Sequence, residues 1–340
     1  MAVILNIDKE KHDTPVLQVR LDEDMHKVDQ LITQSCQSSV ALSTQIIQHL
    51  LDSGGKRLRP KLTLASAYLC DYRGNEHLRL AACIEFIHSA TLLHDDVIDE
   101  STVRRGNKTA CVLWGNKPSI LVGDFLLSRA FDMVVQHGDL AILKLLCDSA
   151  TTIAEGELLQ LTHVGDIEST ENLYLDIIKA KTARLFACAC QLGALVTHKP
   201  DALRQALDSF GLNFGIAFQL IDDVLDYQPH TQPLGKPAGN DFFEKKITLP
   251  VILAYRRGNA HERAFWQRCM QEAKTTPADL HHATQLIRKH QADKDSIQRA
   301  HHYATMAKDS LALLPKNSWH ALLTHHVDAC IQRAQTSTTP

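Results

Sequence analysis

The stretch IEFIHSATLLHDDVID, residues 84–99, decides the fold class of this 340-residue chain. It runs from an apolar helical segment into three aspartates. A second stretch, FGIAFQLIDDVLD at residues 214–226, has the same plan and the same acidic ending. Apolar runs of this length without strand-like alternation predict helices, and each helix is expected to carry its aspartates on adjoining turns at one end.

The rest of the chain shows the same helical spacing between glycine and proline breaks. One such series is formed by Leu140, Leu143, Leu146 and Cys147. Alternation of β-branched residues bounded by hairpin turns is missing. We therefore expect an all-α fold, a single-domain bundle of ten or more helices. Its limits are expected at residues 15–335, between a frayed N-terminus at 1–14 and a polar tail at 336–340.

Composition excludes several classes of protein. The chain is 44% hydrophobic and 22% charged, which is ordinary for a globular protein, and 36 basic against 39 acidic residues leave no positive field for nucleic acid. No apolar run approaches the roughly 20 residues that span a bilayer, and the opening stretch 2–5 is too short for a signal peptide. Nine cysteines without a CxxC pair predict buried small hydrophobes in the reducing cytoplasm.

The acidic endings form a duplicated motif, Asp-Asp-x-x-Asp. Its members are Asp95, Asp96 and Asp99 in the first copy and Asp222, Asp223 and Asp226 in the second. A given copy is expected by chance only ~0.04 times in a chain of this length and average composition. One alternative is a solvated acidic patch. The apolar flanks argue against that patch, because carboxylates packed among apolar side chains need a counter-charge. Mg²⁺ supplies one and completes its octahedron with phosphate oxygens, so the sequence predicts a diphosphate held through metal ions between two acidic helices.

Basic residues gather near these motifs. Lys56 and Arg59 follow the Gly54-Gly55 pair and share one face if a helix begins there, which suits them to one diphosphate, whereas Arg57 and Lys61 fit a solvated loop. Further candidates are Arg104 and Arg105 after the first motif, Lys181 with Thr182, and Lys236 and Lys246 after the second motif.

Two uncharged candidates lie on the acidic helices themselves. His88 precedes Asp95 by seven residues, two helical turns, and Gln219 precedes Asp222 by three. Both are expected to point toward the acidic cluster, although a buried core role is the alternative for the histidine. No phosphate-binding P-loop and no Rossmann glycine fingerprint is present, so nucleotide sites are not predicted.

With these residues assembled, the chain resembles the trans-isoprenyl diphosphate synthases, also called polyprenyl synthetases. Within that family its wording is most similar to the bacterial octaprenyl diphosphate synthases of ubiquinone biosynthesis. The matching blocks occur in the family's order over about residues 20 to 330. They are GGKRLRP at 54–60, EFIH at 85–88, LLHDDVID at 92–99, RRG at 104–106, GDFL at 123–126, EGE at 155–157, KTARLF at 181–186, FQLIDDVLDY at 218–227 and GK at 235–236.

The resemblance implies a prenyltransferase of the isoprenoid synthase fold, with a central apolar cavity that keeps water from a carbocation. Isopentenyl diphosphate is expected on Lys56, Arg59, His88 and Arg105. The allylic diphosphate, expected to be farnesyl diphosphate, is assigned to two or three Mg²⁺ ions on the acidic motifs together with Arg104, Lys181 and Lys236. Thr182 and Gln219 are expected to face the cation, and Lys246 keeps a catalytic lysine position. A cytoplasmic homodimer is also implied.

One loop departs from the family pattern. Where the family shows Gly-Asp-Asp followed by Glu-Gly-Lys-Pro-Thr-Leu-Pro, this chain has GND at 239–241 and EKKITLP at 244–250. A glycine and an aspartate are lost, so the geometry of this loop is left open. Two other functions are alternatives: a class I terpene cyclase and a non-catalytic regulatory subunit of a heteromeric prenyl synthase. The intact second motif and the isopentenyl-binding residues argue against both.

Product length is predicted from helix geometry. Ala90, Ile87 and Ile84 lie five, eight and eleven residues before Asp95, and three-residue steps of about 4.5 Å match one isoprene unit. The small Ala90 lets the growing tail pass, so a deeper floor is expected. Its candidates, Phe131, Met133 and above all Val134, stand on the next helix, although all three fit a core or interface role as well. An octaprenyl product follows, with geranylgeranyl or farnesyl diphosphate synthase as the shorter-chain alternative.

Overall fold

The computed structural model describes residues 4–228, 239–271 and 275–336. It confirms the all-α fold. The described residues form the α-helices α1 to α16, which group into two compact units, each assembled from separate stretches of chain. Unit 1 comprises residues 1–150, 185–211 and 308–326, and unit 2 comprises 151–184, 212–307 and 327–340. The expectation of one domain over 15–335 therefore stays a prediction.

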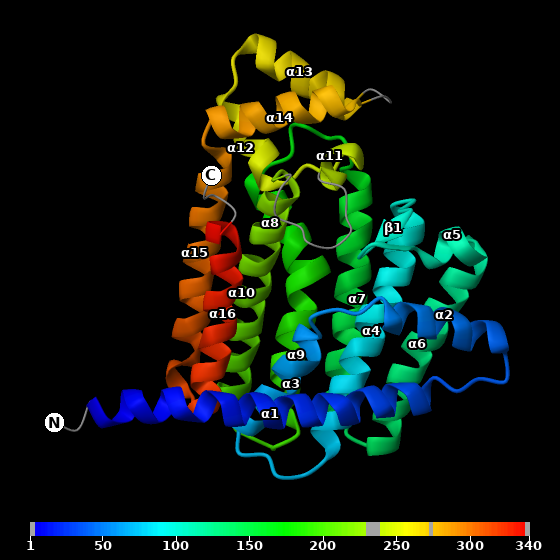
Figure 1. Cartoon of the computed structure of the whole chain (residues 1–340), viewed down its shortest axis with the longest axis vertical. Coiled ribbons are helices and arrows are strands. Elements are labelled where there is room, and N and C mark those ends of the chain that lie inside the picture. The colour runs from blue at the N-terminus through cyan, green and yellow to red at the C-terminus, as the bar shows by residue number, and fades with distance from the viewer. Residues whose placement is uncertain (1–3, 229–238, 272–274, 337–340) are drawn as a thin grey trace. The chain divides into compact units, whose positions relative to one another are not determined.

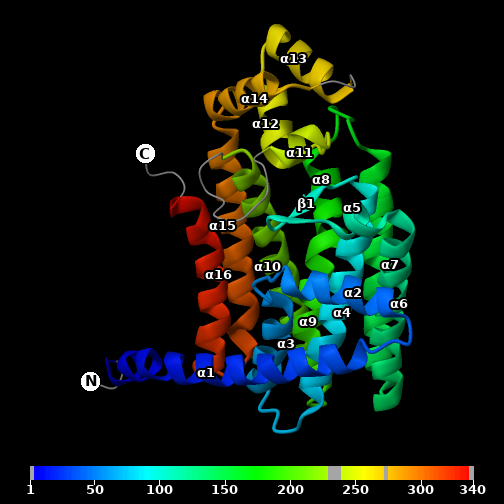
Figure 2. The same ribbon diagram turned by 45° about the vertical axis from the view of Figure 1, so that its right-hand side comes forward.

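Unit 1 is built around one buried helix. Its complete helices are α1 (Ile4–Ser35), α2 (Ala41–Asp52), α3 (Leu58–Leu69), α4 (Glu76–Ile98), α5 (Ala110–Trp114) and α6 (Asn116–His137), with a 3₁₀ turn at Leu311–Leu313. Helix α4 is buried on nearly all sides because α1, α3 and α6 pack against it, and both views show α4 and α6 side by side (Figure 1, Figure 2). Its apolar run is the centre of this unit's core.

Unit 2 contains α8 (Glu171–Ile178), a π-helical turn at Lys179–Ala183, α11 (Asn240–Phe243), α12 (Leu249–Arg257), α13 (Ala260–Gln271) and α14 (Pro277–Lys289). Five longer helices contribute residues to both units: α7 (Leu140–Thr162), α9 (Arg184–Leu195), α10 (Asp201–Asp226), α15 (Ala292–Ser310) and α16 (Ser318–Thr336). Helices α12, α13 and α14 pack on one another at the top of Figure 1, around the fully buried Trp266.

Three details differ from expectation. Residues 4–14, expected to be frayed, form the first turns of α1. A two-stranded hairpin, β1 (Val103–Arg104) and β2 (Asn107–Lys108), interrupts the helices. It forms because Arg105 and Gly106 both take positive φ, 52° and 83°, as a tight two-residue hairpin turn requires. Cys147 is exposed and Cys111 half-buried, whereas the other seven cysteines are buried as predicted. In the described part of the chain, no helix is long and apolar enough to cross a membrane.

Candidate active site

The first acidic motif occupies the C-terminal end of α4, within unit 1. Asp95 and Asp99 are half-buried, whereas Asp96 is only 2% exposed and accepts a hydrogen bond from Arg104 Nε at 2.7 Å. A helix C-terminus carries partial negative charge, which adds to the mutual repulsion of the carboxylates. Arg104 neutralises the charge of Asp96, and the half-buried carboxylates of Asp95 and Asp99 fit a divalent cation.

The hairpin after α4 carries Arg104 and Arg105, the two basic residues that follow the first acidic motif. Arg104 lies in β1 and turns its guanidinium to Asp96, while Arg105 stands at the turn. The Arg105 guanidinium lies directly against Gly55, where a Cβ would overlap it. The glycine loop and the hairpin turn are therefore in contact, and the two basic segments lie close together.

Two pairs join the start of α3 to α4. Arg59 Nη1 lies 3.2 Å from His88 Nε2, and Arg57 makes an ion pair with Glu85. Burial, followed by the positive charges of Arg59 and the other nearby arginines, holds the pKa of His88 well below its usual range. The imidazole is therefore neutral and accepts from Arg59. His88 is thus paired with one of the predicted basic residues, and Lys56 is exposed just before α3.

The second acidic motif ends α10 in unit 2, again at a helix C-terminus. Asp223 is 2% exposed, and its two oxygens accept from Tyr174 Oη and Gln219 Nε2, both at 2.6 Å. Thr182 Oγ1 in turn donates to Gln219 Oε1 at 2.9 Å, so the predicted pair of Thr182 and Gln219 is joined to the motif. Burial and the charges of Asp241 and Asp222 raise the pKa of Asp223, which is the signature of carboxylates crowded enough to favour a cation.

The other two aspartates of this motif have separate partners. Asp226 Oδ2 accepts from the backbone N–H of Asp241 at 2.9 Å and thereby caps α11. Asp222 Oδ1 lies 2.7 Å from Arg333 Nη2 in α16, and the same guanidinium lies 5.3 Å from the Phe218 ring centroid. Asp222 is the half-buried member, as Asp95 and Asp99 are in the first motif.

Lys181 stands in the π-helical turn. Its Nζ lies 2.5 Å from Glu157 Oε2 on α7. The backbone of this turn approaches α7 closely at Gly156, where a Cβ would lie 2.6 Å from Ala180 Cβ and 2.9 Å from the backbone nitrogen of Lys181. A π turn aims its side chains differently from an α-helix, and such turns recur at functional sites.

The loop that departs from the family pattern is built around Glu244. Its carboxylate pairs with Lys246 Nζ at 2.6 Å and accepts from Asn240 Nδ2 at 2.5 Å. An aspartate at position 240 would repel Glu244 instead. Lys245, where the family has glycine, takes φ 56°, a conformation that costs a residue with a Cβ. Lys236 lies outside the described residues.

The donor set fits a hard divalent cation, because both helix ends offer carboxylate oxygens, the ligands that Mg²⁺ prefers. Among the residues that the structure describes, no three metal-binding side chains converge as a ready cage. This agrees with Mg²⁺ chemistry, in which one or two carboxylates suffice and phosphate oxygens complete the shell. Asp95, Asp99 and Asp222 are the half-buried carboxylates of the two motifs.

Sequence reasoning missed the partners of the predicted residues. They are Arg57, Glu85, Glu157, Tyr174, Asp241, Glu244 and Arg333. Glu85 and Glu157 stand inside matched blocks and offered a signal there. Asp241 and Glu244 stand in the loop compared with the family pattern and offered a signal as well. Tyr174 and Arg333 offered none, because each pairs with a residue far away in sequence.

The residues assigned to product length lie in the core of unit 1. Ala90, Ile87 and Ile84 are fully buried on α4, and Val134 is 1% exposed on the adjacent α6. Phe131 is half-buried and Met133 buried. The placement agrees with a shared lining on two packed helices.

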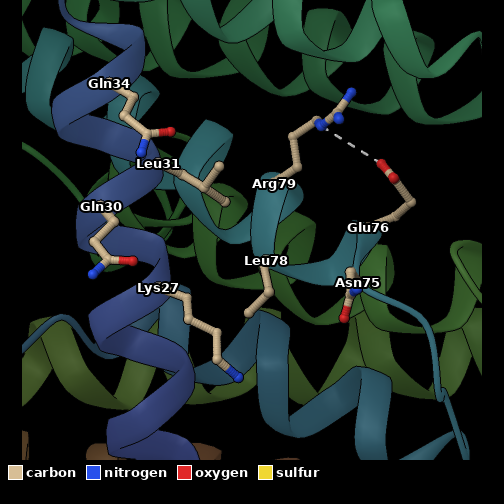
Figure 3. Close-up of a pocket in the computed structure, with 8 residues that line it drawn as sticks. All are labelled: Lys27, Gln30, Leu31, Gln34, Asn75, Glu76, Leu78 and Arg79. Carbon is tan, nitrogen blue, oxygen red and sulfur yellow. Dashed lines mark ion pairs between the residues drawn. The ribbon is translucent and has the colours of Figure 1, made fainter.

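A polar pocket lies at the opposite end of α4. It has a volume of about 450 Å³ and is lined mainly by amide and charged side chains of α1 and early α4, with the Arg79–Glu76 ion pair at its rim (Figure 3). Lys27, which also lines it, is already paired with Asp24 at 2.7 Å. The pocket holds no acidic motif and stands apart from the candidate site residues.

Known proteins resemble the chain over most of its length. The family model "Polyprenyl synthetase" matches residues 40–287. An octaprenyl diphosphate synthase of Haemophilus influenzae is 40% identical over 303 residues, covering 89% of this chain and 92% of that protein. An all-trans-nonaprenyl-diphosphate synthase of Rhodobacter capsulatus is 38% identical over 314 residues, covering 92% and 96%.

A solved structure shows the same arrangement of helices. Polyprenyl synthase from Caulobacter crescentus, crystallised with calcium and isoprenyl diphosphate, matches with a TM-score of 0.90 and 44% identity, over 93% of this chain and 97% of that one. The duplicated acidic motif, the arginine cluster around His88 of α4 and these matches lead to one conclusion. The chain belongs to the polyprenyl synthetase family of trans-prenyltransferases.

Proposed function

We propose that the chain is a long-chain trans-polyprenyl diphosphate synthase that adds isopentenyl units to an allylic diphosphate and makes an octaprenyl product. One observation carries the proposal: in each unit an acidic helix end has a cationic side chain bound to it, Arg104 on Asp96 and Arg333 on Asp222. Paired charges of this kind suit a ligand that is itself a metal-bound anion. The named relatives make octaprenyl and nonaprenyl products, which supports the chain length.

Each group of residues has a proposed task. Lys56, Arg59, His88 and Arg105 bind the diphosphate of isopentenyl diphosphate. Asp95, Asp99 and Asp222 are the Mg²⁺ ligands, with Asp96, Asp223 and Asp226 holding the motifs in shape. Arg104, Lys181, Lys236 and Lys246 neutralise the allylic diphosphate as it leaves.

The reaction breaks the allylic C–O bond, and the electron pair leaves with the diphosphate. Bound Mg²⁺ supplies electrostatic stabilisation of that leaving group. The double bond of isopentenyl diphosphate then forms the new C–C bond, and the proton released from its adjacent carbon is accepted by the departed diphosphate. Thr182 and Gln219 direct oxygens toward the cation, and their fixed chain to Asp223 keeps them oriented.

The finer parts of the proposal concern context. Farnesyl diphosphate is the proposed primer, two or three Mg²⁺ ions the cofactor, and a homodimer the working form. The product is proposed to supply the side chain of ubiquinone. All nine cysteines are free, which fits work in the reducing cytoplasm.

The test is product analysis of the purified chain. We incubate it with Mg²⁺, isopentenyl diphosphate and farnesyl diphosphate, then size the dephosphorylated product. The expected product contains eight isoprene units and is absent when Mg²⁺ is chelated. A C15 or C20 end product would contradict the long-chain assignment, and a cyclic hydrocarbon would assign a cyclase instead. No turnover by the chain alone would indicate a regulatory subunit.

A further inference from the structure

The inference concerns the positive charge packed around the end of α3. The guanidiniums of Arg57, Arg59, Arg104 and Arg105 all act on the same histidine, His88. Like charges at this density repel one another, so the site needs built-in counter-charges to keep its shape. Two buried carboxylates supply this counter-charge. Asp96 pairs with Arg104, and Glu85 pairs with Arg57.

Glu85 is placed as a counter-charge and not as a ligand. It is 6% exposed on α4, one helical turn before His88; burial raises its pKa, and the charges of Arg57, Arg59 and Arg105 oppose that shift. A carboxylate repels a diphosphate, so direct contact with the substrate would oppose binding. What Glu85 can do is hold the arginine that faces it.

Arg57 in turn controls the start of α3. It is the N-cap of that helix and has φ 47°, a left-handed conformation that costs a residue with a Cβ. The ion pair with Glu85 keeps it there, and Asp29 of α1 lies 4.0 Å from Arg57 Nε on another side. Two residues later Arg59 reaches His88, with its guanidinium 4.6 Å from the Phe186 ring centroid.

We propose that Arg57 and Glu85 form a positioning pair, which fixes the first turn of α3 and thereby aims Arg59 at the diphosphate of isopentenyl diphosphate. This inference rests on the proposed function. Neither residue touches the substrate. The pair replaces the solvated-loop interpretation of Arg57, and it gives a role to a buried glutamate that the mechanism otherwise does not use.

The two possible roles of Glu85, positioning Arg57 and neutralising positive charge, predict opposite changes in the KM for isopentenyl diphosphate. If Glu85 only cancels positive charge, its removal increases the attraction for a diphosphate and lowers the KM for isopentenyl diphosphate. If it positions Arg57, the same change loosens the turn and raises that KM. The allylic substrate is assigned to other residues, so its KM is a measure of general damage.

The experiment is a double-mutant cycle in the full-length chain with Glu85→Gln, Arg57→Met and both together. Wild type is assayed first, because absence of turnover there overturns the proposed function and not the pair. Each single variant is expected to raise the KM for isopentenyl diphosphate about tenfold and the KM for farnesyl diphosphate less than about twofold. The double variant is expected to stay near tenfold, not the roughly hundredfold of independent effects.

Glu76→Gln is the matched control, the same change on the same helix at the far rim of the polar pocket (Figure 3). It should leave both KM values at the wild-type level. The inference is overturned if Glu85→Gln lowers or does not change the KM for isopentenyl diphosphate, or if the two single effects multiply. Should circular dichroism show Glu85→Gln unfolded, Arg57→Met alone decides, and an unchanged KM in that folded variant overturns the pair.

Discussion

At the scale of residues, the molecule places carboxylates where a helix disfavours them. Both acidic motifs end a helix, so each aspartate meets the negative end of the dipole and its own neighbours. Asp96 and Asp223 survive this because arginine, tyrosine and amide donors bind them. The half-buried aspartates, Asp95, Asp99 and Asp222, are the proposed Mg²⁺ ligands.

Asp95→Ala and Asp222→Ala should each lower turnover by about two orders of magnitude or more, since each removes a proposed Mg²⁺ ligand. Folding should persist, because the change also relieves like-charge repulsion. Steady-state turnover at saturating Mg²⁺, with a thermal melt of each variant, checks both statements. Near-wild-type turnover in either variant would contradict the metal assignment.

Glu262 in α13 gives a prediction about acid stability. Its buried carboxylate bonds Lys289 Nζ at 2.5 Å, His290 Nε2 at 2.9 Å and the backbone N–H of Asn259 at 3.0 Å. The hydrogen bond from Lys289, followed by those from Asn259 and His290, lowers its pKa from 4.5 to about 2. A pKa lowered by folding stabilises the protein above 4.5, and this contribution is lost as the pH falls toward 2.

Glu262→Gln should therefore destabilise the chain at pH 7 by about 1–2 kcal/mol, and the difference from wild type should shrink between pH 4.5 and 2. Urea unfolding across that pH range measures it. A constant difference at every pH would assign the effect to packing and not to the ionised carboxylate.

At the scale of elements, irregular segments set the direction of the candidate site side chains. The hairpin turn presents Arg105, and the π-helical turn at Lys179–Ala183 carries Lys181 and Thr182. In a regular α-helix, successive side chains are rotated by about 100° per residue, so the direction of a single side chain cannot be changed locally. Small residues make room for such pieces.

Gly156→Ala tests the π turn. The added methyl would press on Ala180 and the Lys181 backbone, so the turn must move and take Lys181 and Thr182 with it. Turnover should fall about tenfold while the KM for isopentenyl diphosphate stays within about twofold. Thr151→Ala, an exposed change on the same helix, is the control. Equal turnover in Gly156→Ala would show that the turn's position does not matter.

Ala90→Phe tests the path of the growing chain. Ala90 is fully buried where α4 packs against α6, and a ring there would fill the space beside the first isoprene levels. The expected result is an active enzyme whose main product is shorter than wild type, seen by sizing the dephosphorylated products. A fully active variant with unchanged product length would show that the tail takes another route.

At the scale of the whole molecule, an apolar surface supports the proposed homodimer. Val112, Leu113, Ile120, Leu121 and Val135 are exposed on α5 and α6, with Leu121 at 66%. Helices α5 and α6 contact each other, and four of these residues, Val112, Leu113, Ile120 and Leu121, lie on α5 and on the first two turns of α6. Apolar groups gathered in this way mark a protein contact.

Leu121→Asp should convert the dimer to a monomer, because an unpaired carboxylate in the contact is costly. Light scattering should report a mass falling from twice the 37.9 kDa chain to one chain. Leu313→Asp, at an equally exposed leucine in the 3₁₀ turn, should leave the dimer intact. A wild-type chain that is already monomeric would contradict the proposal.

The sequence alone was sufficient for the fold class and for the acidic helix ends, because apolar runs and Asp-Asp-x-x-Asp spacing are local properties. It also singled out Arg59, His88, Thr182 and Gln219, which the structure joins in pairs. The hairpin escaped prediction, since two-residue strands carry almost no pattern.

Only the tertiary structure determines which charged and polar side chains pair with one another. Arg57 finds Glu85 across 28 residues and Tyr174 finds Asp223 across 49, so no local spacing announces either pair. A side chain's partner depends on how helices distant in sequence pack, and burial then makes that partner obligatory. For this reason Arg57 resembles a loop residue in the sequence, whereas in the structure it is the half-buried N-cap of α3 and pairs with the buried Glu85.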